Sequence, residues 1–294
     1  MGHAVIESGG GWTAWPAPAK LNLFLHVTGR RKDGYHLLQT VFQLLDWGDT
    51  IHLRIRRDDS IRRIGALPGV AEQDDLVVRA ARLLQRATST GLGAEIRIDK
   101  QIPMGGGLGG GSSDAATTLV ALNLLWNCGL GISELAELGA CLGADVPVFV
   151  HGRSAFAEGV GEQLTPLDLP DQCYVVVYPG TGVPTAELFQ CAELTRDSAP
   201  LTIAGFVSGA SARNAFEPVV RARYPEVAQA LDWLGQFGDS RLSGTGASVF
   251  VVVDMDRAQA IVDQCPSGMR AWVVRGVNRS PLLAMLPVNG GHVA

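Results

Sequence analysis

The sequence has few of the features that mark membrane or secreted proteins. Charged residues make up only 18% of the 294 positions, yet no uninterrupted apolar run approaches the length of a membrane span, since Asn123 and Asn127 break the most hydrophobic region. The N-terminus lacks a basic start followed by an apolar core, so we expect no signal peptide. These absences predict a soluble protein with no membrane partner.

Metal and disulfide patterns are also missing. The five cysteines are odd in number, widely spaced and without a Cys-x-x-Cys pair, which predicts reduced thiols in a cytoplasmic protein. The six histidines form no pair at helical spacing, so we expect no structural zinc site, and the sequence identifies no metal ligand. Basic residues number 24 against 29 acidic ones, and the net charge of −5 argues against a nucleic-acid partner.

Apolar residues, in contrast, are abundant and predict well-packed cores. They make up 47% of the chain, which is typical of a globular protein and excludes general disorder. The length allows two domains, and the Pro- and Asp-rich segment 165–171 is the best boundary between them. We therefore predict an N-terminal domain over 1–168, a C-terminal domain over 169–294, and a monomer or weak homodimer.

The most unusual stretch is a glycine loop, with six glycines among residues 105–111. Such a backbone can approach another group closely and adopt positive φ. The apolar run 115–126 predicts a buried helix, with Ser112, Ser113 and Asp114 at its cap and first turn. Since a helix N-terminus offers free N–H groups to an anion, we predict that this stretch binds a nucleotide phosphate. The predicted binding residues are Pro103, Met104, Gly105, Gly106, Gly107, Leu108, Gly109, Gly110, Gly111, Ser112 and Ser113.

Better-known glycine patterns fit this loop poorly. Gly105-x-Gly107-x-x-Gly110 matches the dinucleotide-binding pattern, but Pro103-Met104 separate it from the strand predicted at 94–99, and a second helix follows the first. A P-loop would need Lys-Ser/Thr after Gly110, and no strand with a protein-kinase lysine follows. A flexible linker does not usually join an amphipathic strand to an apolar helix. The phosphate loop thus has no lysine of its own.

Two segments near the N-terminus have open interpretations. Residues 20–27 alternate as in a strand, which puts Lys20 and Asn22 on the face opposite the leucines, toward solvent or a ligand. The loop 28–36 carries three consecutive basic residues and then Tyr35 and His36. These side chains suit phosphate contact and base stacking, or they form a solvated hairpin.

The rest of the N-terminal half predicts strands and helices around one acidic residue. We expect a strand, a turn at 46–49 and a second strand within 39–56, and helices over 75–88 and 133–142. Asp145 stands at a break between the last helix and an extended, proline-containing run, 146–150. A single aspartate at such a break is usually a cap or turn residue.

The C-terminal half reads as β-α-β-β-α-β with extra helix inserted, the order of a ferredoxin-like domain. Gly244-Thr245-Gly246 forms a second small-residue loop, either a hairpin turn or a backstop to the phosphate site. The predicted strands are 173–178, 241–243, 248–253 and 269–277, and the helices are 185–191, within 201–237, and 257–265.

Three segments together resemble a known superfamily. Residues 18–25, 103–116 and 242–247 stand in the order of the three motifs of the GHMP kinases, which include galactokinase, homoserine kinase and mevalonate kinase. Within them the chain is similar to the 4-diphosphocytidyl-2-C-methyl-D-erythritol kinases, through residues 29–40, 49–51 and 142–149. The likeness runs from about Trp15 to Leu286.

The resemblance implies a fold and an activity. The fold would be the α+β GHMP kinase fold, with an N-terminal domain like ribosomal protein S5 domain 2 and a C-terminal ferredoxin-like domain. The activity would be transfer of the γ-phosphoryl group of ATP, with Mg²⁺, to the 2-hydroxyl of 4-diphosphocytidyl-2-C-methyl-D-erythritol. Another GHMP small-molecule kinase, or a non-catalytic nucleotide-binding protein on this fold, is the alternative. Diphosphomevalonate decarboxylase is disfavoured by Tyr35-His36.

The resemblance also implies roles for single residues. Lys20 and Asp145 would be the catalytic pair, and residues 103–113 would hold ATP. Tyr35 and Phe189 would sandwich the cytosine, His36 would read its edge, and Asn22 would lie near the sugar or phosphate. Two points stay open: Asp114 caps the helix or orients a metal, and Asp75 and Leu76 lie near a plausible adenine site.

Overall fold

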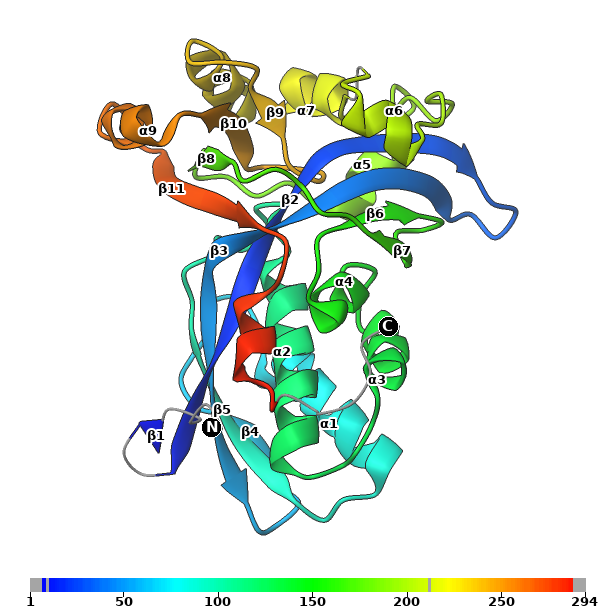
Figure 1. Ribbon diagram of the computed structural model, residues 1–294, viewed down its shortest axis with the longest axis vertical. Coiled ribbons are helices and arrows are strands. Elements are labelled where there is room, and N and C mark those ends of the chain that lie inside the picture. Colours follow the sequence, from blue (N-terminus) through cyan, green and yellow to red (C-terminus); the bar gives the residue numbers. More distant parts are fainter. Residues whose placement is uncertain (1–6, 9–10, 211–212, 288–294) are drawn as a thin grey trace.

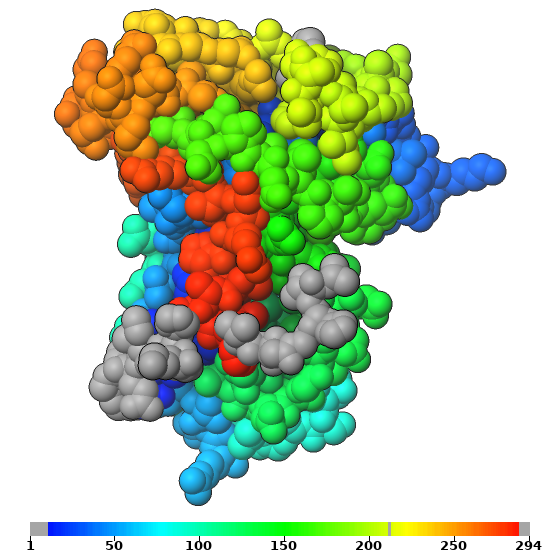
Figure 2. Space-filling model, viewed as in Figure 1, coloured from blue at the N-terminus to red at the C-terminus, as the bar shows by residue number. Residues whose placement is uncertain are grey.

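A computed structural model describes residues 7–8, 11–210 and 213–287, arranged as two halves joined by two long strands (Figure 1). Strands β2 (Trp12–Arg30) and β3 (His36–Arg56) pair antiparallel and run from the lower half into the upper half. The tip of their hairpin projects from the surface (Figure 2). No helix within these ranges is both long and apolar enough to cross a membrane.

The lower half is a sheet with helices on one face (Figure 1). Its buried core joins the long strands to the helices, with Trp15, Leu84 and Leu119 among the residues inaccessible to solvent. Besides the long strands, its elements are β1 (Glu7–Ser8), β4 (Ile61–Arg63), β5 (Gly93–Asp99), η1 (Glu72–Asp74), α1 (Leu76–Thr88), α2 (Gly110–Leu125), α3 (Ile132–Ala140) and α4 (Val146–His151). The central helix α2 is buried because apolar and small residues occupy nearly every side of it.

Three local predictions for this half are wrong. The turn predicted at 46–49 is a bulge in the continuous strand β3, where the pairing shifts between Pro18 and Lys20. The run 146–150 is helical, because proline near a helix start leaves no hydrogen bond unmade. Helix α2 begins two residues before the predicted serine cap, after Gly109, whose φ of +73° suits glycine.

The upper half has the predicted β-α-β-β-α-β order. Its antiparallel strands lie in the order β11-β8-β10-β9, continued by pairing of β11 with β3 into the lower half. The hairpin β6 (Ala155–Glu158) and β7 (Gln163–Pro166) pairs with β3. The elements are β8 (Cys173–Tyr178), α5 (Thr185–Gln190), α6 (Ile203–Val207), α7 (Glu217–Arg223), α8 (Pro225–Leu234), β9 (Arg241–Leu242), β10 (Val249–Val253), α9 (Met255–Val262) and β11 (Arg270–Val277). After β11 the chain returns to the lower half, where η2 (Pro281–Met285) lies beside α2 (Figure 1).

The two halves exchange segments. Leu25 and Val27 of β2 are buried in the core of the upper half, and Leu282 of η2 is buried in the core of the lower half. The N-terminal hairpin therefore belongs to both halves, since its strands pack in the core of each.

Candidate active site

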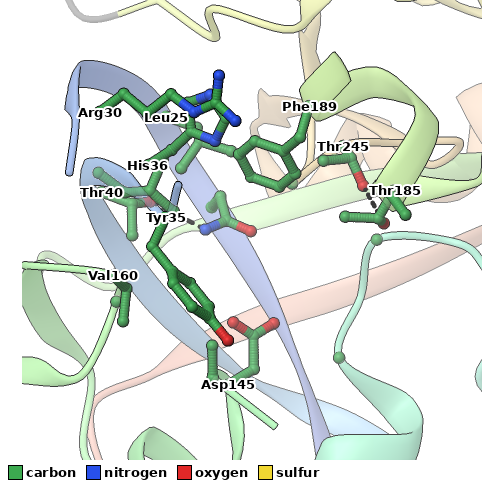
Figure 3. Close-up of a pocket in the computed structure, with 18 of the residues that line it drawn as sticks. Leu25, Arg30, Tyr35, His36, Thr40, Asp145, Val160, Thr185, Phe189 and Thr245 are labelled. Atoms are coloured by element: carbon green, nitrogen blue, oxygen red, sulfur yellow. Dashed lines mark hydrogen bonds between the residues drawn. The ribbon is translucent and has the colours of Figure 1, made fainter. Parts of the chain in front are cut away.

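A cavity of about 800 Å³ lies between the halves (Figure 3). Its wall is formed by the hairpin of β2 and β3, the glycine loop, the start of α4, helix α5 and the loop after β9. Of the residues predicted to act here, the cavity is lined by Lys20, Asn22, Tyr35, His36, Gly107, Gly109, Asp145 and Phe189. The other nine residues of 103–113 do not line it. Residues far apart in the sequence thus meet at one cavity.

Lys20 and Asp145 form an ion pair in the cavity wall. Lys20 Nζ lies 3.3 Å from Asp145 Oδ2, and the lysine is 3% exposed whereas the aspartate is 34% exposed. The same Nζ donates to Asn22 Oδ1 and, at 3.2 Å, to the carbonyl of Gly107. Asn22 in turn donates to Thr40 Oγ1 at 2.9 Å. The buried cation is therefore fixed by three acceptors, while the carboxylate retains access to the cavity.

The glycine loop needs its glycines for two reasons. Gly105, Gly107 and Gly109 have φ of +67°, +73° and +73°. A Cβ on Gly107 would also lie 2.3 Å from the carbonyl oxygen of Ser243, and one on Gly109 would lie 2.8 Å from the ring of Phe149. The loop thus has no room for a side chain at Gly107, which packs on the backbone of residues 243–246, or at Gly109, which packs on Phe149.

The start of α2 offers donors beside this loop. Gly109 caps the helix without a side-chain hydrogen bond, and the hydrogen bond that closes the first turn runs from Ser113 N to Gly109 O at 2.8 Å. The N–H groups of residues 110–112 therefore lack intrahelical partners. They fit an anion, because the positive end of the helix dipole lies here as well.

The loop 243–246 lies against the glycine loop. Ser243 Oγ donates to the carbonyl of Gly107 at 3.0 Å and accepts from the backbone N–H of Asn22 at 3.3 Å. Asn214 holds the loop from behind through the carbonyls of Leu242 and Gly244, at 2.9 and 2.7 Å. The upper half therefore supports the loop and strand that the lower half brings to the cavity.

Aromatic side chains gather at the other end of the cavity. The rings of His36 and Phe189 stack, with centroids 4.9 Å apart and planes at 29°. Tyr35 is 64% exposed and points toward Asp145 (Figure 3). The predicted base-binding residues thus come together, although His36 rather than Tyr35 faces the ring of Phe189.

Comparisons with known proteins agree with this arrangement. Residues 75–153 match the family model "GHMP kinases N terminal domain", and residues 201–271 match "GHMP kinases C terminal". The chain is 62% identical to the 4-diphosphocytidyl-2-C-methyl-D-erythritol kinase of Xanthomonas euvesicatoria pv. vesicatoria (strain 85-10) over 281 residues, 95% of each chain. It is 58% identical to the kinase of that name from Xylella fastidiosa (strain 9a5c), covering 96% and 95%. The chain belongs to the 4-diphosphocytidyl-2-C-methyl-D-erythritol kinase family.

Solved structures support the assignment to this kinase family. A crystal structure of 4-(cytidine 5'-diphospho)-2C-methyl-D-erythritol kinase superposes with a TM-score of 0.76 and 33% identity, covering 90% of this chain and 100% of that one. A mevalonate kinase superposes with a TM-score of 0.68 at 16% identity, over 90% and 99%, which shows the fold alone. The predicted α+β GHMP kinase fold, with its N- and C-terminal domains, is confirmed.

In this member of the 4-diphosphocytidyl-2-C-methyl-D-erythritol kinase family, the sequence did not single out several residues at the site. Arg196 lines the cavity and donates from Nε to His36 Nε2 at 3.1 Å. Thr185 and Thr245 also line it, and their hydroxyls lie 2.7 Å apart. No local pattern marks Arg196 or Thr185, since each is a single polar side chain, whereas Thr245 belongs to the small-residue loop 244–246 that the sequence did single out.

A buried charge cluster behind the glycine loop was missed as well. Lys100 Nζ lies 2.5 Å from Asp49 Oδ2 and 2.7 Å from Asp114 Oδ2. Asp49 Oδ1 also accepts from the backbone N–H groups of Gln101 and Ile102, at 2.6 and 2.8 Å, whereas Asp114 Oδ1 is buried and unpaired. Asp114 therefore does not cap α2 but pairs with a lysine that lies beside the loop.

The burial of this cluster shifts the pKa values of Asp114 and Lys100. Burial raises the pKa of Asp114 to about 8, with the nearby charge of Asp49 adding to the rise and Lys100 opposing it. Burial lowers the pKa of Lys100, but the two carboxylates outweigh it and raise the pKa overall. Lys100 thus stays charged, and Asp114 is the group that takes up a proton.

Asp75 and Leu76 lie at the start of α1. Asp75 accepts from the N–H of Val77 at 3.1 Å and pairs with Arg63 at 2.7 Å, so its carboxylate serves the helix cap. Leu76 reaches toward the glycine loop, where a Cβ on Gly111 would lie 3.3 Å from its Cδ1. Within the described ranges no three His, Cys, Asp or Glu side chains are grouped to hold a metal ion.

Proposed function

We propose that this chain transfers the γ-phosphoryl group of ATP to the 2-hydroxyl of 4-diphosphocytidyl-2-C-methyl-D-erythritol, giving the 2-phosphate and ADP in non-mevalonate isoprenoid biosynthesis. The names of relatives 58–62% identical to it support this substrate. The observation that carries the proposal is the Lys20–Asp145 pair, which lies on one cavity between the glycine loop and the aromatic residues. A hydroxyl held there would meet a base and a cation together.

Asp145 acts as the base in this proposal. As the bond forms between the substrate oxygen and the γ-phosphorus, the bond from that phosphorus to the β–γ bridging oxygen breaks, and the hydroxyl proton passes to the carboxylate. Lys20 supplies a positive charge 3.3 Å from Asp145, where it can stabilise negative charge on the attacking oxygen and the γ-phosphoryl group. Its three fixed acceptors keep that charge in place without reorganisation.

ATP binds through residues 103–113 in this proposal. The unpaired N–H groups of residues 110–112 and the start of α2 supply the donors, since the loop itself contains no lysine. Mg²⁺ fits as an ion that arrives with the triphosphate, because it commonly binds phosphate oxygens, water and few protein groups. The ion would neutralise charge on the phosphates during the transfer.

The cytidyl group binds at the aromatic end of the cavity. Tyr35 is exposed and free to close over a base, and Phe189 offers an aromatic surface already packed against His36. Asn22, next to Lys20, lies where the sugar or phosphate passes between the two ends. We further propose a domain boundary near residue 168, a cytoplasmic location, and a monomer or weak homodimer.

The test is ADP release by the purified protein. We expect release that requires ATP, Mg²⁺ and the cytidyl substrate, with the 2-phosphate as the product identified by phosphorus NMR. Homoserine, galactose and mevalonate serve as competing substrates, and carbon dioxide is measured to detect decarboxylation. Turnover of another alcohol in place of the cytidyl compound would overturn the substrate, and tight ATP binding without any turnover would overturn catalysis.

A further inference from the structure

Arg196 follows helix α5 and makes four hydrogen bonds with its guanidinium inside the protein. Its Nη groups donate to the carbonyls of Phe189 at 2.9 Å, Cys191 at 2.7 Å and Leu194 at 3.1 Å. Its Nε donates to Nε2 of His36 at 3.1 Å. The arginine therefore links the segment 189–196 of the upper half to the hairpin that carries His36. These hydrogen bonds indicate that Arg196 fixes the position of His36 and of the segment 189–196.

The bond from Arg196 determines the chemistry of the histidine ring. An arginine side chain has donors and no acceptor, so Nε2 of His36 accepts and carries no proton. Burial lowers the pKa of His36, and the charges of Arg196 and Arg30 lower it further. The ring is therefore neutral at pH 7, and its single proton must be on Nδ1.

Nδ1 is left as a donor for a ligand. Among the described residues, none forms a hydrogen bond with Nδ1 of His36. This atom is also not one of the fully buried polar atoms without a partner, so it keeps some access to solvent. The stacked ring of Phe189 fixes the plane of the imidazole, and both residues line the cavity. The site thus offers a base one N–H group in a fixed direction.

Such a donor discriminates between pyrimidines. Position N3 of cytosine is an acceptor, whereas N3 of uracil carries a hydrogen and would face the Nδ1–H of His36 donor to donor. A site that forms a hydrogen bond with its ligand strongly rejects an analogue that cannot form this bond. An apolar pocket, in comparison, rejects an analogue with one additional group only weakly. A free histidine, in contrast, could change tautomer and accept the N3–H of uracil.

We propose that Arg196 is a positioning residue that holds His36 in its Nδ1–H tautomer and so makes the site prefer a cytosine base to a uracil base. This inference rests on the proposed function, because it takes the cytidyl group as the ligand of His36. The simpler alternative is that Arg196 only clamps the loop 189–196. A clamp would affect stability and leave both the tautomer and the base preference unchanged.

The first test reads the tautomer without any substrate. Proton–nitrogen correlation spectra of protein labelled with ¹⁵N in the histidine rings distinguish Nδ1–H from Nε2–H, and a His36→Gln variant identifies the signals of His36. We expect Nδ1–H in the unchanged protein and in Arg196→Lys, which keeps a donor, and loss of that single state in Arg196→Met. Nε2–H in the unchanged protein would overturn the proposal.

The second test compares kcat and KM for the cytidyl substrate and its uridyl counterpart. In Arg196→Met we expect KM for the cytidyl compound to rise about tenfold, kcat to stay within about twofold, and the cytidyl-to-uridyl ratio of kcat/KM to fall about tenfold, as for one lost hydrogen bond. Arg196→Lys should retain most of the preference. An unchanged preference in Arg196→Met would leave Arg196 as a clamp.

Arg223→Met is the matched control. Arg223 holds the same loop from outside through Glu193, at 3.1 Å, and both side chains are largely exposed. Removing it should leave the tautomer and the preference unchanged, and an equal loss in this variant would overturn the specific role of Arg196. If the unchanged protein fails to phosphorylate the cytidyl compound, the proposed function fails, whereas the tautomer measurement still stands.

Discussion

The two ends of the cavity are built in different ways. The end formed by residues 103–109 and 243–246 is named the phosphate end here after its proposed ligand. Its surface is backbone: Gly107 packs on the carbonyls of residues 243 and 246, and its own carbonyl accepts from the side chains of Lys20 and Ser243. At the end formed by residues 35–36 and 189–196, named the base end after its proposed ligand, the surface consists of side chains: two stacked rings, and an arginine that joins one of them to the carbonyls of the segment 189–196.

This difference predicts that the phosphate end is rigid and that the base end selects the ligand. A backbone cradle cannot change without moving the chain, so the phosphate end is formed before any ligand arrives. The base end depends on side chains, of which Tyr35 is exposed and so has room to rotate, and the pairing of these side chains selects which ligand fits. Substitutions at the phosphate end should therefore affect turnover and folding, and substitutions at the base end should affect KM and specificity.

The largest expected effect lies where the two ends meet. Asp145→Asn removes the proton acceptor and keeps the shape, so kcat should fall by about 10²–10⁴-fold with little change in KM. Lys20→Met should lower kcat similarly and also destabilise the fold by about 1–3 kcal/mol, because the buried Oδ1 of Asn22 loses its donor and the carbonyl of Gly107 keeps only Ser243. Single-turnover kinetics and urea unfolding measure the two effects.

Glu158→Gln, in the hairpin of β6 and β7, is the control for loss of a carboxylate outside the cavity. In the described part of the chain, the side chain of Glu158 forms a hydrogen bond only with Gln39. It should keep kcat. An Asp145→Asn enzyme with near-normal kcat would remove the aspartate from its proposed role, and a rise in KM alone would place its effect in binding.

The next effect tests how rigid the phosphate end is. Gly107→Ala and Gly105→Ala both force a side chain into positive φ, which costs about 1–2 kcal/mol. Only at Gly107 does the new Cβ meet a carbonyl at 2.3 Å, whereas at Gly105 the nearest atom is 3.6 Å away, so overpacking should add about 1–3 kcal/mol at Gly107 alone. Urea unfolding gives the difference, and ATP titration should show weaker binding mainly in Gly107→Ala.

Equal losses in the two glycine variants would contradict the difference between them. The backbone would then move away from Ser243 at little cost, and the phosphate end would be as adaptable as the base end. A normal ATP affinity in Gly107→Ala, despite lower stability, would separate the packing of the loop from its proposed ligand.

The same contrast explains what the sequence could predict. The glycine loop and its helix are contiguous, so their pattern is visible in one stretch, and the structure brings that stretch beside Lys20 and Asp145 as the resemblance implied. The base end joins His36 to Phe189 and Arg196, more than 150 residues further along, and no local pattern links them. Tertiary pairing of this kind is invisible to periodicity.

Local patterns also failed where packing overrode them. Asp46-Trp47-Gly48-Asp49 has the composition of a turn, yet β2 pairs with β3 on both sides of it and turns it into a bulge. The run after Asp145 is as apolar as a strand, but it is short and packs on α2 and α3 as a helix, which periodicity alone does not distinguish.

The smallest expected effect on turnover concerns the buried charge cluster behind the phosphate end. The pKa of Asp114 is raised to about 8, above its value near 4 in the unfolded chain, so the folded state binds more protons between these values. Its contribution to stability is therefore complete below about pH 4 and is lost as the pH rises toward 8. Asp114→Asn is neutral at every pH and should remove this loss, so the variant should gain stability relative to the unchanged protein from pH 5 to pH 8.

Urea unfolding at several pH values measures this gain, with Asp168→Asn as the control because that aspartate is 81% exposed. The control should change little with pH. Since the amide oxygen introduced by Asp114→Asn can still accept from Lys100, kcat should change by less than about threefold if the cluster only supports the loop. A much larger loss of kcat, with stability retained, would mean that the charge of Asp114 acts on the bound phosphates, and that the phosphate end depends on a side chain as the base end does.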